Sequence, residues 1–335
     1  MPNDTGLWPP ARKDGDAERN GQTGGPPRDD VARAALAGLT ATPKTLPPWL
    51  FYDPEGCRLF YEITRLPEYY LTRTEDSVLA AHVAEMVPDT MRHATLVEFG
   101  ASTEHKARRL LDLRDAAGTP VFDTFVPVDV AQAELMAMRA RLARSHPALR
   151  VKPVVADFMR PLALPGLTGP VMGYFPGSTI GNLNPVDAAD FLVRVRAALG
   201  EGAWLLLGAD LRKDPAIVLP AYDDAAGVTA AFNLNLLTRL NREADGRFDL
   251  AAFAHRAVWN DRDSRIEMHL VSRTEQSVPV AGRTIRFHEG ETIHTENSYK
   301  HPPAALRALA RSAGWQAERS WTDAAGWFGV FLFRS

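Results

Sequence analysis

The feature that most constrains the fold of this chain is an alternation of short apolar runs with longer amphipathic runs in its middle part. The apolar runs occupy residues 95–100, 125–130, 150–158, 170–182 and 203–211. Helix-like stretches separate them, for example AADFLVRVRAAL at 188–199. Strands that alternate with helices form parallel sheets covered on both faces, and such strands are apolar throughout. The sequence therefore predicts an α/β fold with a parallel, doubly wound sheet.

The length of the chain predicts more than one folded part. Its 335 residues exceed the ~250–300 at which one hydrophobic core usually stops growing. The alternation lapses after Leu211, and strand-like runs return only at SWTDAAG and FGVFLFR near the end. We therefore expect two lobes, or one domain with a large insertion. Residues 1–30 are rich in Pro, Gly, Asp, Asn and Arg, and we expect them to form a disordered arm.

The balance of charges and the single cysteine limit the partners of the protein. Lysine and arginine total 38 against 41 acidic residues, so no basic field attracts nucleic acid or an anionic membrane. The sequence has no run of ~18 apolar residues and no signal-peptide core. Cys57 is the only cysteine, and no spacing typical of zinc ligands is present. We expect a cytoplasmic protein that binds a small molecule and no metal. We also expect a monomer, because no heptad seam calls for a dimer.

Three polar features stand where predicted strands end, which is the edge at which such sheets bind ligands. The turn after the first strand has one glycine, Gly100, and lacks the G-x-G-x-x-G pattern that holds a pyrophosphate. Asp129 ends the second strand, and a carboxylate there accepts hydrogen bonds from ribose hydroxyls. Asp157 and Phe158 follow the third strand and suit the amine and the ring of a purine. Together they indicate adenosine without phosphate, as in S-adenosylmethionine.

Each of these residues also has a purely structural interpretation. Gly100 suits an ordinary tight turn, and a strand-terminal aspartate such as Asp129 or Asp157 often caps the next helix. Phe158 then belongs to the core. These alternatives stay open for each residue taken alone.

Several long blocks resemble the histidine Nα-methyltransferases of ergothioneine biosynthesis. The blocks are LPPWLFYD (46–53), LFYEITRLPEYYLTRTE (59–75), PGSTIGN (176–182), AYDDAAGVTAAFNLNLLTRLNRE (221–243), SRIEMHLVSR (264–273) and GETIHTENSYK (290–300). The resemblance implies a class I, Rossmann-like methyltransferase sheet and a second, smaller α+β domain. It assigns residues 31–72 and 213–300 to a substrate-binding domain, and residues 73–212 and 301–335 to an S-adenosylmethionine-binding domain.

The resemblance also implies which residues contact the cofactor. They are Gly100, Lys106, Asp129, Asp157 and Phe158, with Lys106 near the methionine carboxylate. An exposed surface lysine is the alternative for Lys106. In the family a second glycine follows two residues after the first, whereas Ser102 stands there in this chain.

For the amino-acid substrate, the resemblance assigns donors to the carboxylate, a wall of tyrosines and partners of the imidazole ring. Asn182 and Tyr222 would donate to the carboxylate, and Tyr69 and Tyr52 would line the pocket. Glu296 and Ser298 would bind the imidazole, with Met268 beside the ring, and Thr229 would lie near the amine. Tyr52 is assigned as proton acceptor or relay. Without the resemblance, Glu296 suits a solvated loop and Met268 the core.

The activity implied is S-adenosylmethionine-dependent Nα-methylation, up to trimethylation, of L-histidine to its betaine, hercynine. Another amino acid such as tryptophan, or a natural-product amine, is the alternative acceptor. An alternative from another functional class is a regulator that binds an adenosine ligand without turnover. Such a protein would not need a second polar pocket made by Asn182, Tyr222 and Glu296. A nicotinamide-dependent oxidoreductase needs a phosphate-cradling glycine loop, which this sequence lacks.

Overall fold

The structure is a computed structural model that describes residues 28–101 and 103–335, and these residues form two compact units. Unit 1 holds the described residues up to Tyr70 together with Lys213–Tyr299, and unit 2 holds Leu71–Arg212 and Lys300–Ser335. The arm predicted at 1–30 lies outside the described residues except for its last three, which belong to the first helix, and Ser102 lies outside them too. In the described part of the chain, no helix is both long and apolar enough to cross a membrane.

Unit 2 is built on an eight-stranded sheet with the order β13-β14-β7-β6-β2-β3-β4, in which β5 also pairs with β3. The strands are β2 (Ala94–Phe99), β3 (Phe122–Asp129), β4 (Arg150–Val151), β5 (Val154–Val155), β6 (Val171–Phe175), β7 (Trp204–Asp210), β13 (Gln316–Thr322) and β14 (Phe328–Arg334). Strands β2 to β7 pair in parallel, and β14 and β13 add an antiparallel edge. The predicted parallel α/β sheet is confirmed. The direction of chain order reverses between β2 and β6, which makes this point the switch at which ligands bind.

The third apolar run, at 150–158, forms two short strands where one was expected. Pro153 stands between β4 and β5 and has no N–H to give to the ladder. Both pieces still pair with β3 in parallel, and the Lys152 N–H donates to the Phe125 carbonyl over 2.8 Å. The run therefore keeps its place in the sheet but not its continuity.

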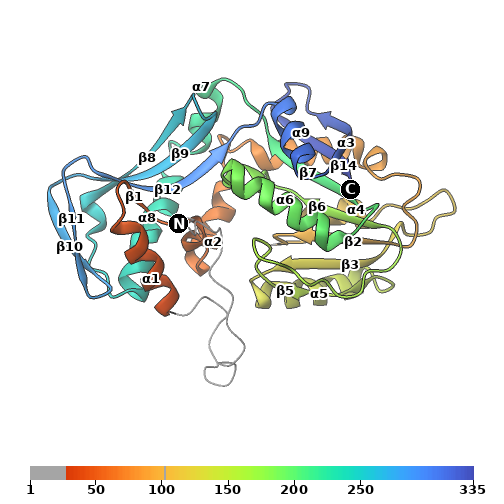
Figure 1. Ribbon diagram of the computed structural model, residues 1–335, viewed down its shortest axis with the longest axis horizontal. Helices are drawn as coiled ribbons and strands as arrows, with labels where there is room; N and C mark the ends of the chain where they lie inside the picture. The colour runs from red at the N-terminus through yellow and green to blue at the C-terminus, as the bar shows by residue number, and fades with distance from the viewer. Residues whose placement is uncertain (1–27, 102) are drawn as a thin grey trace, which may run out of the picture. The chain divides into compact units, whose positions relative to one another are not determined.

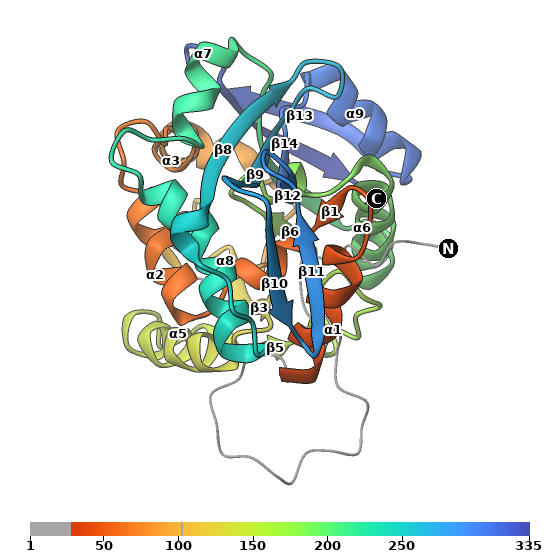
Figure 2. The same cartoon turned by 90° about the vertical axis from the view of Figure 1, so that its left-hand side faces the viewer.

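Helices cover both faces of this sheet, as the fully buried β2 requires. They are α3 (Leu71–Met86), α4 (His105–Leu111), α5 (Gln132–Ser145), α6 (Pro185–Leu199) and α9 (Pro303–Ser312). Figures 1 and 2 show α6 and α9 on one side of the sheet and α3 and α5 on the other. Helix α6 begins three residues before the stretch predicted at 188–199, because Pro185 suits the first helical position.

Each face of the sheet has its own apolar core. Side chains of α3, α4 and α5 pack with one face of β2, β3, β6, β7 and β14. On the other face, Phe175 and Phe191 lie 4.4 Å apart between ring centroids, and Phe99 and Phe158 contact Phe191 edge-on. The aromatic cluster fixes Phe158 at the end of the third strand region.

Unit 1 contains a four-stranded sheet with the order β1-β12-β9-β8 and a separate hairpin. The strands are β1 (Lys44–Thr45), β8 (Phe253–Asn260), β9 (Arg265–Ser272) and β12 (Thr292–Tyr299), with β10 (Gln276–Val280) and β11 (Arg283–Phe287) in the hairpin. The helices are α1 (Arg28–Leu39), α2 (Pro54–Ile63), α7 (Pro215–Val218) and α8 (Val228–Glu243), with the short 3-10 helices η1 (Pro48–Phe51), η3 (Leu219–Ala221) and η4 (Leu250–Ala252). This is the smaller α+β part that the resemblance implied.

The sheet of unit 1 has one buried and one partly exposed face. Burial alternates along β9, which is typical of an antiparallel strand with one face on a core. Helix α8 contacts β8 and β9 and lies beside β8 in Figure 2. The face turned toward α8 is called the inner face below, and the opposite face the outer face.

One buried carboxylate ties the WLFYD segment to α8. Asp53 caps α2 by accepting the Gly56 N–H over 2.7 Å, and it also accepts from Asn235 at 2.8 Å and Arg242 at 2.6 Å on α8. The buried Arg239 of α8 donates to the Leu50 carbonyl over 2.9 Å. These bonds hold the segment around Tyr52 against the helix.

The outer face carries a stacked pair of imidazoles. The ring centroids of His269 on β9 and His294 on β12 lie 5.0 Å apart. His269 Nε2 lies within hydrogen-bond distance, 3.2 Å, of the Glu267 carboxylate. Burial, and then the neighbouring His294, lower the pKa of His269 to about 4. Both effects disfavour the charged imidazole in the folded state.

We expect this imidazole to make unfolding easier in acid. An unfolded histidine takes up a proton near pH 6.5, whereas His269 in the fold does so only near pH 4. Its stability contribution is therefore complete above pH 6.5 and is lost as the pH falls toward 4, by on the order of 2–3 kcal/mol. Denaturant unfolding of His269→Gln at pH 7, 6, 5 and 4 should show a flatter decline than the original chain. His288→Gln, an exposed position, is the control, and an equal slope in both variants would contradict the assignment.

Candidate functional site

The turn after β2 brings Gly100 against Phe158. Gly100 has a φ of +76°, which favours glycine, and a Cβ placed there would lie 3.5 Å from the Phe158 ring. Its N–H donates to the Val128 carbonyl on β3 over 2.9 Å. The backbone is thus held open beside an aromatic ring at the carboxyl end of the central strand.

Asp129 and Asp157 lie close together at the same edge. Asp129 of β3 pairs with Val155 of β5, and the Ala156 N–H donates to the Asp129 carbonyl over 3.0 Å. Both carboxylates are buried, and each caps the next turn at 2.8 Å, Asp129 through Ala131 and Asp157 through Met159. Burial raises the pKa of both acids. Each aspartate thus accepts a backbone N–H two residues further on, in a turn, and neither is the N-cap residue of a helix. The two acids lie in one place, where they suit a ligand rich in hydroxyl and amino donors.

Lys106 sits in the first turn of α4 and forms an ion pair with Glu75 of α3. Its side chain is 18% exposed, so it is not an exposed surface lysine. The Glu75 carboxylate is 1% exposed, and both of its oxygens also accept the Gly177 N–H, at 2.9 and 3.0 Å. Sequence reasoning assigned no role to Glu75.

The turn after β6 leads to Asn182. It passes through Gly177 and Ser178, which have φ values of +79° and +59°, and the 3-10 helix η2 (Thr179–Asn182) follows. The Ser178 hydroxyl accepts the Asp210 N–H of β7 over 2.9 Å, and Asp210 pairs with Lys300 over 2.9 Å. Neither Asp210 nor Lys300 is exposed to solvent. The turn is thus fixed to the end of β7.

Two further buried polar groups lie next to these residues and were not predicted. Glu98 of β2 and Tyr174 of β6 are register partners and are 2% and 1% exposed. Burial raises the pKa of the Glu98 carboxyl and of the Tyr174 hydroxyl well above their ordinary values. Within the described residues, Glu98 Oε2 and the Tyr174 hydroxyl make no hydrogen bond. The available signal was an acidic residue two positions before the turn glycine.

A row of aromatic rings in unit 1 connects the predicted tyrosines. Tyr52 contacts Phe60 edge-on at 6.2 Å, Phe60 contacts Tyr69 at 6.4 Å, and Tyr69 contacts Tyr222 at 6.3 Å. The Tyr222 hydroxyl and the Ser298 hydroxyl share a hydrogen bond of 2.8 Å. The structure therefore gathers Tyr52, Tyr69, Tyr222 and Ser298 in one wall.

A β-bulge places Glu296 on the same inner face. Strand β12 pairs His294 with His269 and Glu296 with Met268, so Thr295 is an extra residue in the strand. Because of this insertion, Glu296 and Ser298 face the same way as the buried Met268, whereas regular alternation would turn them to the outer face. The Glu296 side chain is 8% exposed. The interpretation of Glu296 as a solvated loop carboxylate is therefore wrong.

Tyr52 lies within the electrostatic reach of this group. Burial, followed by the charges of Glu296 and Tyr69, raises the pKa of its hydroxyl well above 10. This direction is opposite to the one a tyrosinate base requires. Tyr52 is therefore a neutral phenol in the pH range of ordinary enzymes.

Tyr222 is also held through its backbone. His255 Nε2 lies 2.8 Å from the Tyr222 carbonyl, and Asn233 Nδ2 lies 2.8 Å from His255 Nδ1. Since Asn233 donates to Nδ1, Nε2 carries the proton of this imidazole. Burial lowers the pKa of His255, which keeps it neutral. Neither residue was predicted, because both act through another residue.

Thr229 lies in the first turn of α8. It is buried, and its N–H donates to Asp224 over 2.7 Å in the cap of the helix. In the described part of the chain, no group of three or more His, Cys, Asp or Glu side chains is arranged to hold a metal ion.

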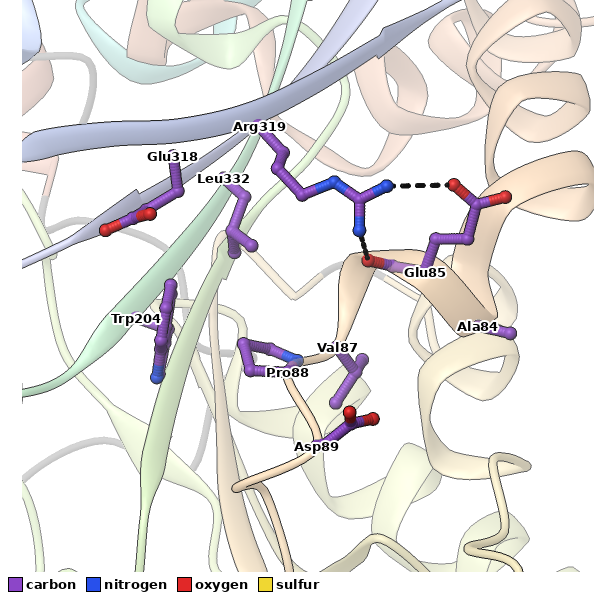
Figure 3. Close-up of a pocket in the computed structure, with 9 residues that line it drawn as sticks. All are labelled: Ala84, Glu85, Val87, Pro88, Asp89, Trp204, Glu318, Arg319 and Leu332. Carbon is purple, nitrogen blue, oxygen red and sulfur yellow. Dashed lines mark hydrogen bonds and ion pairs between the residues drawn. The ribbon is translucent and has the colours of Figure 1, made fainter.

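A separate cavity of about 290 Å³ lies in unit 2 and contains none of the predicted residues. It is lined by Ala84, Glu85, Val87, Pro88, Asp89, Trp204, Glu318, Arg319 and Leu332, with Arg319 bound to Glu85 (Figure 3). Trp204 starts β7, so the cavity is at the amino ends of the parallel strands. Ligands of such sheets bind at the opposite edge, and we do not assign this cavity to function.

Comparison with known proteins gives one consistent result. The family described as histidine-specific methyltransferase, SAM-dependent, matches residues 31–335. Histidine N-alpha-methyltransferase of Mycolicibacterium smegmatis is 45% identical over 305 residues, covering 90% of this chain and 94% of the relative. The protein of the same name in Mycobacterium tuberculosis is 44% identical over 304 residues, with the same coverages. Ergothioneine biosynthesis protein 1 of Neurospora crassa is 30% identical over 288 residues, 84% of this chain and 32% of that longer protein.

The buried pair of Asp210 and Lys300 generates a stability prediction. Lys300→Met removes the cation that compensates the Asp210 carboxylate at a site without solvent, and it should lower the free energy of unfolding by about 3–5 kcal/mol. The double variant Asp210→Asn with Lys300→Met removes both charges and should recover most of that loss. Urea unfolding followed by circular dichroism measures both. Equal losses in the single and double variants would show that the charge pairing is not what stabilises this position.

Proposed function

Because this chain belongs to the family of histidine-specific, S-adenosylmethionine-dependent methyltransferases, we propose that it methylates the α-amine of histidine, up to three times, to form the betaine. Its cofactor is S-adenosylmethionine. The observation that best supports histidine as acceptor is Glu296, a buried carboxylate turned by a bulge toward Met268, Tyr222 and Ser298. A buried acceptor selects a substrate with an N–H to donate and rejects apolar side chains.

The residues at the strand ends of unit 2 fit S-adenosylmethionine. The open backbone at Gly100, the ring of Phe158 and the two neighbouring acids Asp129 and Asp157 offer a flat apolar contact and acceptors for hydroxyl and amino groups. Lys106 would hold the methionine carboxylate. When bound, the cofactor supplies a methyl group already activated by its sulfonium.

We propose the division of labour that the sequence implied. Residues 31–72 and 213–300 bind the amino acid, and residues 73–212 and 301–335 bind the cofactor. Tyr222 and Asn182 donate hydrogen bonds to the substrate carboxylate, and Thr229 lies near the amine. Glu296 and Ser298 hold the imidazole, with Met268 against the ring, and Tyr69 lines the wall.

Proton loss from the amine has to precede each transfer, because a protonated amine has no lone pair. The unperturbed pKa of an α-amine is about 8 in a peptide and higher in a free amino acid, so only a minor part of the substrate is neutral near pH 7 to 8. Tyr52 stays protonated, so we propose that its hydroxyl orients the amine and relays the proton to water and does not act as a tyrosinate. Each added methyl enlarges the amine, and the apolar wall of Tyr52, Phe60 and Tyr69 suits that growth.

We also propose that the enzyme acts as a cytoplasmic monomer. The single cysteine rules out a disulfide within the chain, and the near-balanced charges favour a small-molecule partner.

An acceptor screen tests the proposed reaction directly. Purified protein with S-adenosylmethionine and histidine should yield mono-, di- and trimethylated histidine by mass spectrometry. Tryptophan, phenylalanine and leucine are the parallel acceptors. Product from one of these but none from histidine would reject the histidine assignment and retain the methyltransferase.

The selective role of Glu296 is tested by Glu296→Ala. The change removes the acceptor for an imidazole N–H, and a loss of ~2 kcal/mol lowers kcat/KM for histidine about thirtyfold, mainly through KM. Acceptance of tryptophan relative to histidine should rise, because a charge is removed and space is created. Glu267→Ala is the matched control, since Glu267 lies on β9 and faces outward. An unchanged histidine-to-tryptophan preference in Glu296→Ala would remove Glu296 from the substrate site.

A further inference from the structure

Glu75 is a buried carboxylate near the carboxyl ends of the parallel strands β6 and β7 in unit 2. It lies on α3, and 1% of its surface is exposed, although glutamate is almost never fully buried unless it is paired. Its partners are the Lys106 ammonium and the Gly177 N–H, which donates to both oxygens at 2.9 and 3.0 Å. Three elements distant in sequence thus meet at one carboxylate.

Strand β7 has a glycine where it passes the Glu75 carboxylate. Gly208 lies within β7, and a Cβ placed there would come within 2.2 Å of Glu75 Oε1. The φ of Gly208 is not in the left-handed region, so the backbone alone does not require a glycine. A glycine inside a strand weakens it and often marks a close approach of another group. The missing side chain at Gly208 is therefore explained by the space that the carboxylate needs.

The two partners of Glu75 belong to segments with different proposed ligands, the cofactor for Lys106 and the amino acid for the turn that begins at Gly177. Lys106 lies in the first turn of α4, the helix that follows the Gly100 turn, and Gly177 opens the turn that ends at Asn182. An ammonium has three donors, so the ion pair with Glu75 fixes the direction of Lys106 and leaves donors for a second carboxylate. Holding Gly177 in turn fixes the start of the segment that carries Asn182.

We propose that Glu75 is a positioning residue that holds Lys106 toward the cofactor carboxylate and the Gly177 turn in register with it. The inference rests on the proposed function for the roles of Lys106 and Asn182. Glu75 itself does not touch the reacting atoms. Its effect is to present the cofactor lysine and the substrate asparagine in one fixed arrangement before either ligand binds.

The neighbouring residue supplies a matched control. Asp76 also lies on α3 and also pairs with α4, through two hydrogen bonds of 2.7 Å to Arg109. This pair joins the same two helices, but Arg109 has no role in the proposed sites. A merely structural contribution of the α3–α4 contact would therefore appear in Asp76→Asn as well.

The test measures binding of S-adenosylhomocysteine by calorimetry, which needs no methyl acceptor. Glu75→Gln should raise the Kd about tenfold, and Asp76→Asn should change it less than about twofold. Lys106→Met should also raise the Kd, and the double variant Glu75→Gln with Lys106→Met should bind no more weakly than Lys106→Met alone, because Glu75 acts through Lys106. In steady state, Glu75→Gln should also raise the KM for the amino acid more than it lowers kcat.

The outcomes separate this inference from the proposed function. Equal affinities of Glu75→Gln and Asp76→Asn, or additive losses in the double variant, would overturn the positioning role even if the original chain methylates histidine. If Glu75→Gln does not fold, Glu75→Asp keeps the charge but is one methylene too short to reach both partners. An unchanged Kd in Glu75→Asp would equally refute the role. If the chain does not methylate histidine, the affinities for S-adenosylhomocysteine still test the role of Glu75, because they need no methyl acceptor.

Discussion

The constraint on which this structure depends is that both faces of the parallel sheet in unit 2 are buried. A strand such as β2, with all its residues covered, can carry few polar side chains along its length, and the burial of its Glu98 raises the pKa of that carboxyl. Polar side chains resume where the strands end, at Asp129 and Asp157, beside the open backbone of Gly100, and it is there that we propose the cofactor binds. The same constraint explains why the groups behind this edge, Glu75 and Lys300, occur in ion pairs.

Unit 1 meets a similar requirement by another means. Its antiparallel sheet has one covered face, and the side of each residue is set by the alternation along the strand. A single extra residue, Thr295, shifts that alternation and turns Glu296 and Ser298 inward beside Met268. Meanwhile His294, which precedes the shift on β12, stays on the outer face and stacks there on its partner His269 of β9. One bulge thus places polar side chains of the same strand on both the inner and the outer face of the sheet.

The parts that could be predicted from sequence are those set by local pattern. Apolar runs gave the parallel strands and their ends, since a buried strand must be apolar and its end is where polar residues resume. Pattern did not reveal the bulge at Thr295, because a bulge depends on pairing with a second strand. The break at Pro153 was not predicted either, although a proline without an N–H was its signal. Pattern also missed Glu75 and His255, which act through partners far away in the sequence. The cofactor and substrate roles came from resemblance, and they remain proposals to be tested residue by residue.

The acids at the functional edge fall into two electrostatic classes, and the difference fits their proposed roles. Glu104 receives two hydrogen bonds from Arg141, which lower its pKa, and Glu75 is paired with Lys106. For Asp129 and Asp157, burial is the largest influence, and their pKa values are raised. Asp157 does have an ion pair, with Arg160 at 3.3 Å, but Arg160 lies only three residues further along the chain, whereas the partners of Glu75 and Glu104 lie on other elements and so join separate parts of the unit. A buried carboxylate whose charge is poorly compensated instead gains most from the donors of a ligand, because those donors stabilise its charged form where water does not. This difference agrees with the roles proposed above, in which Asp129 and Asp157 contact the cofactor and Glu75 holds Lys106.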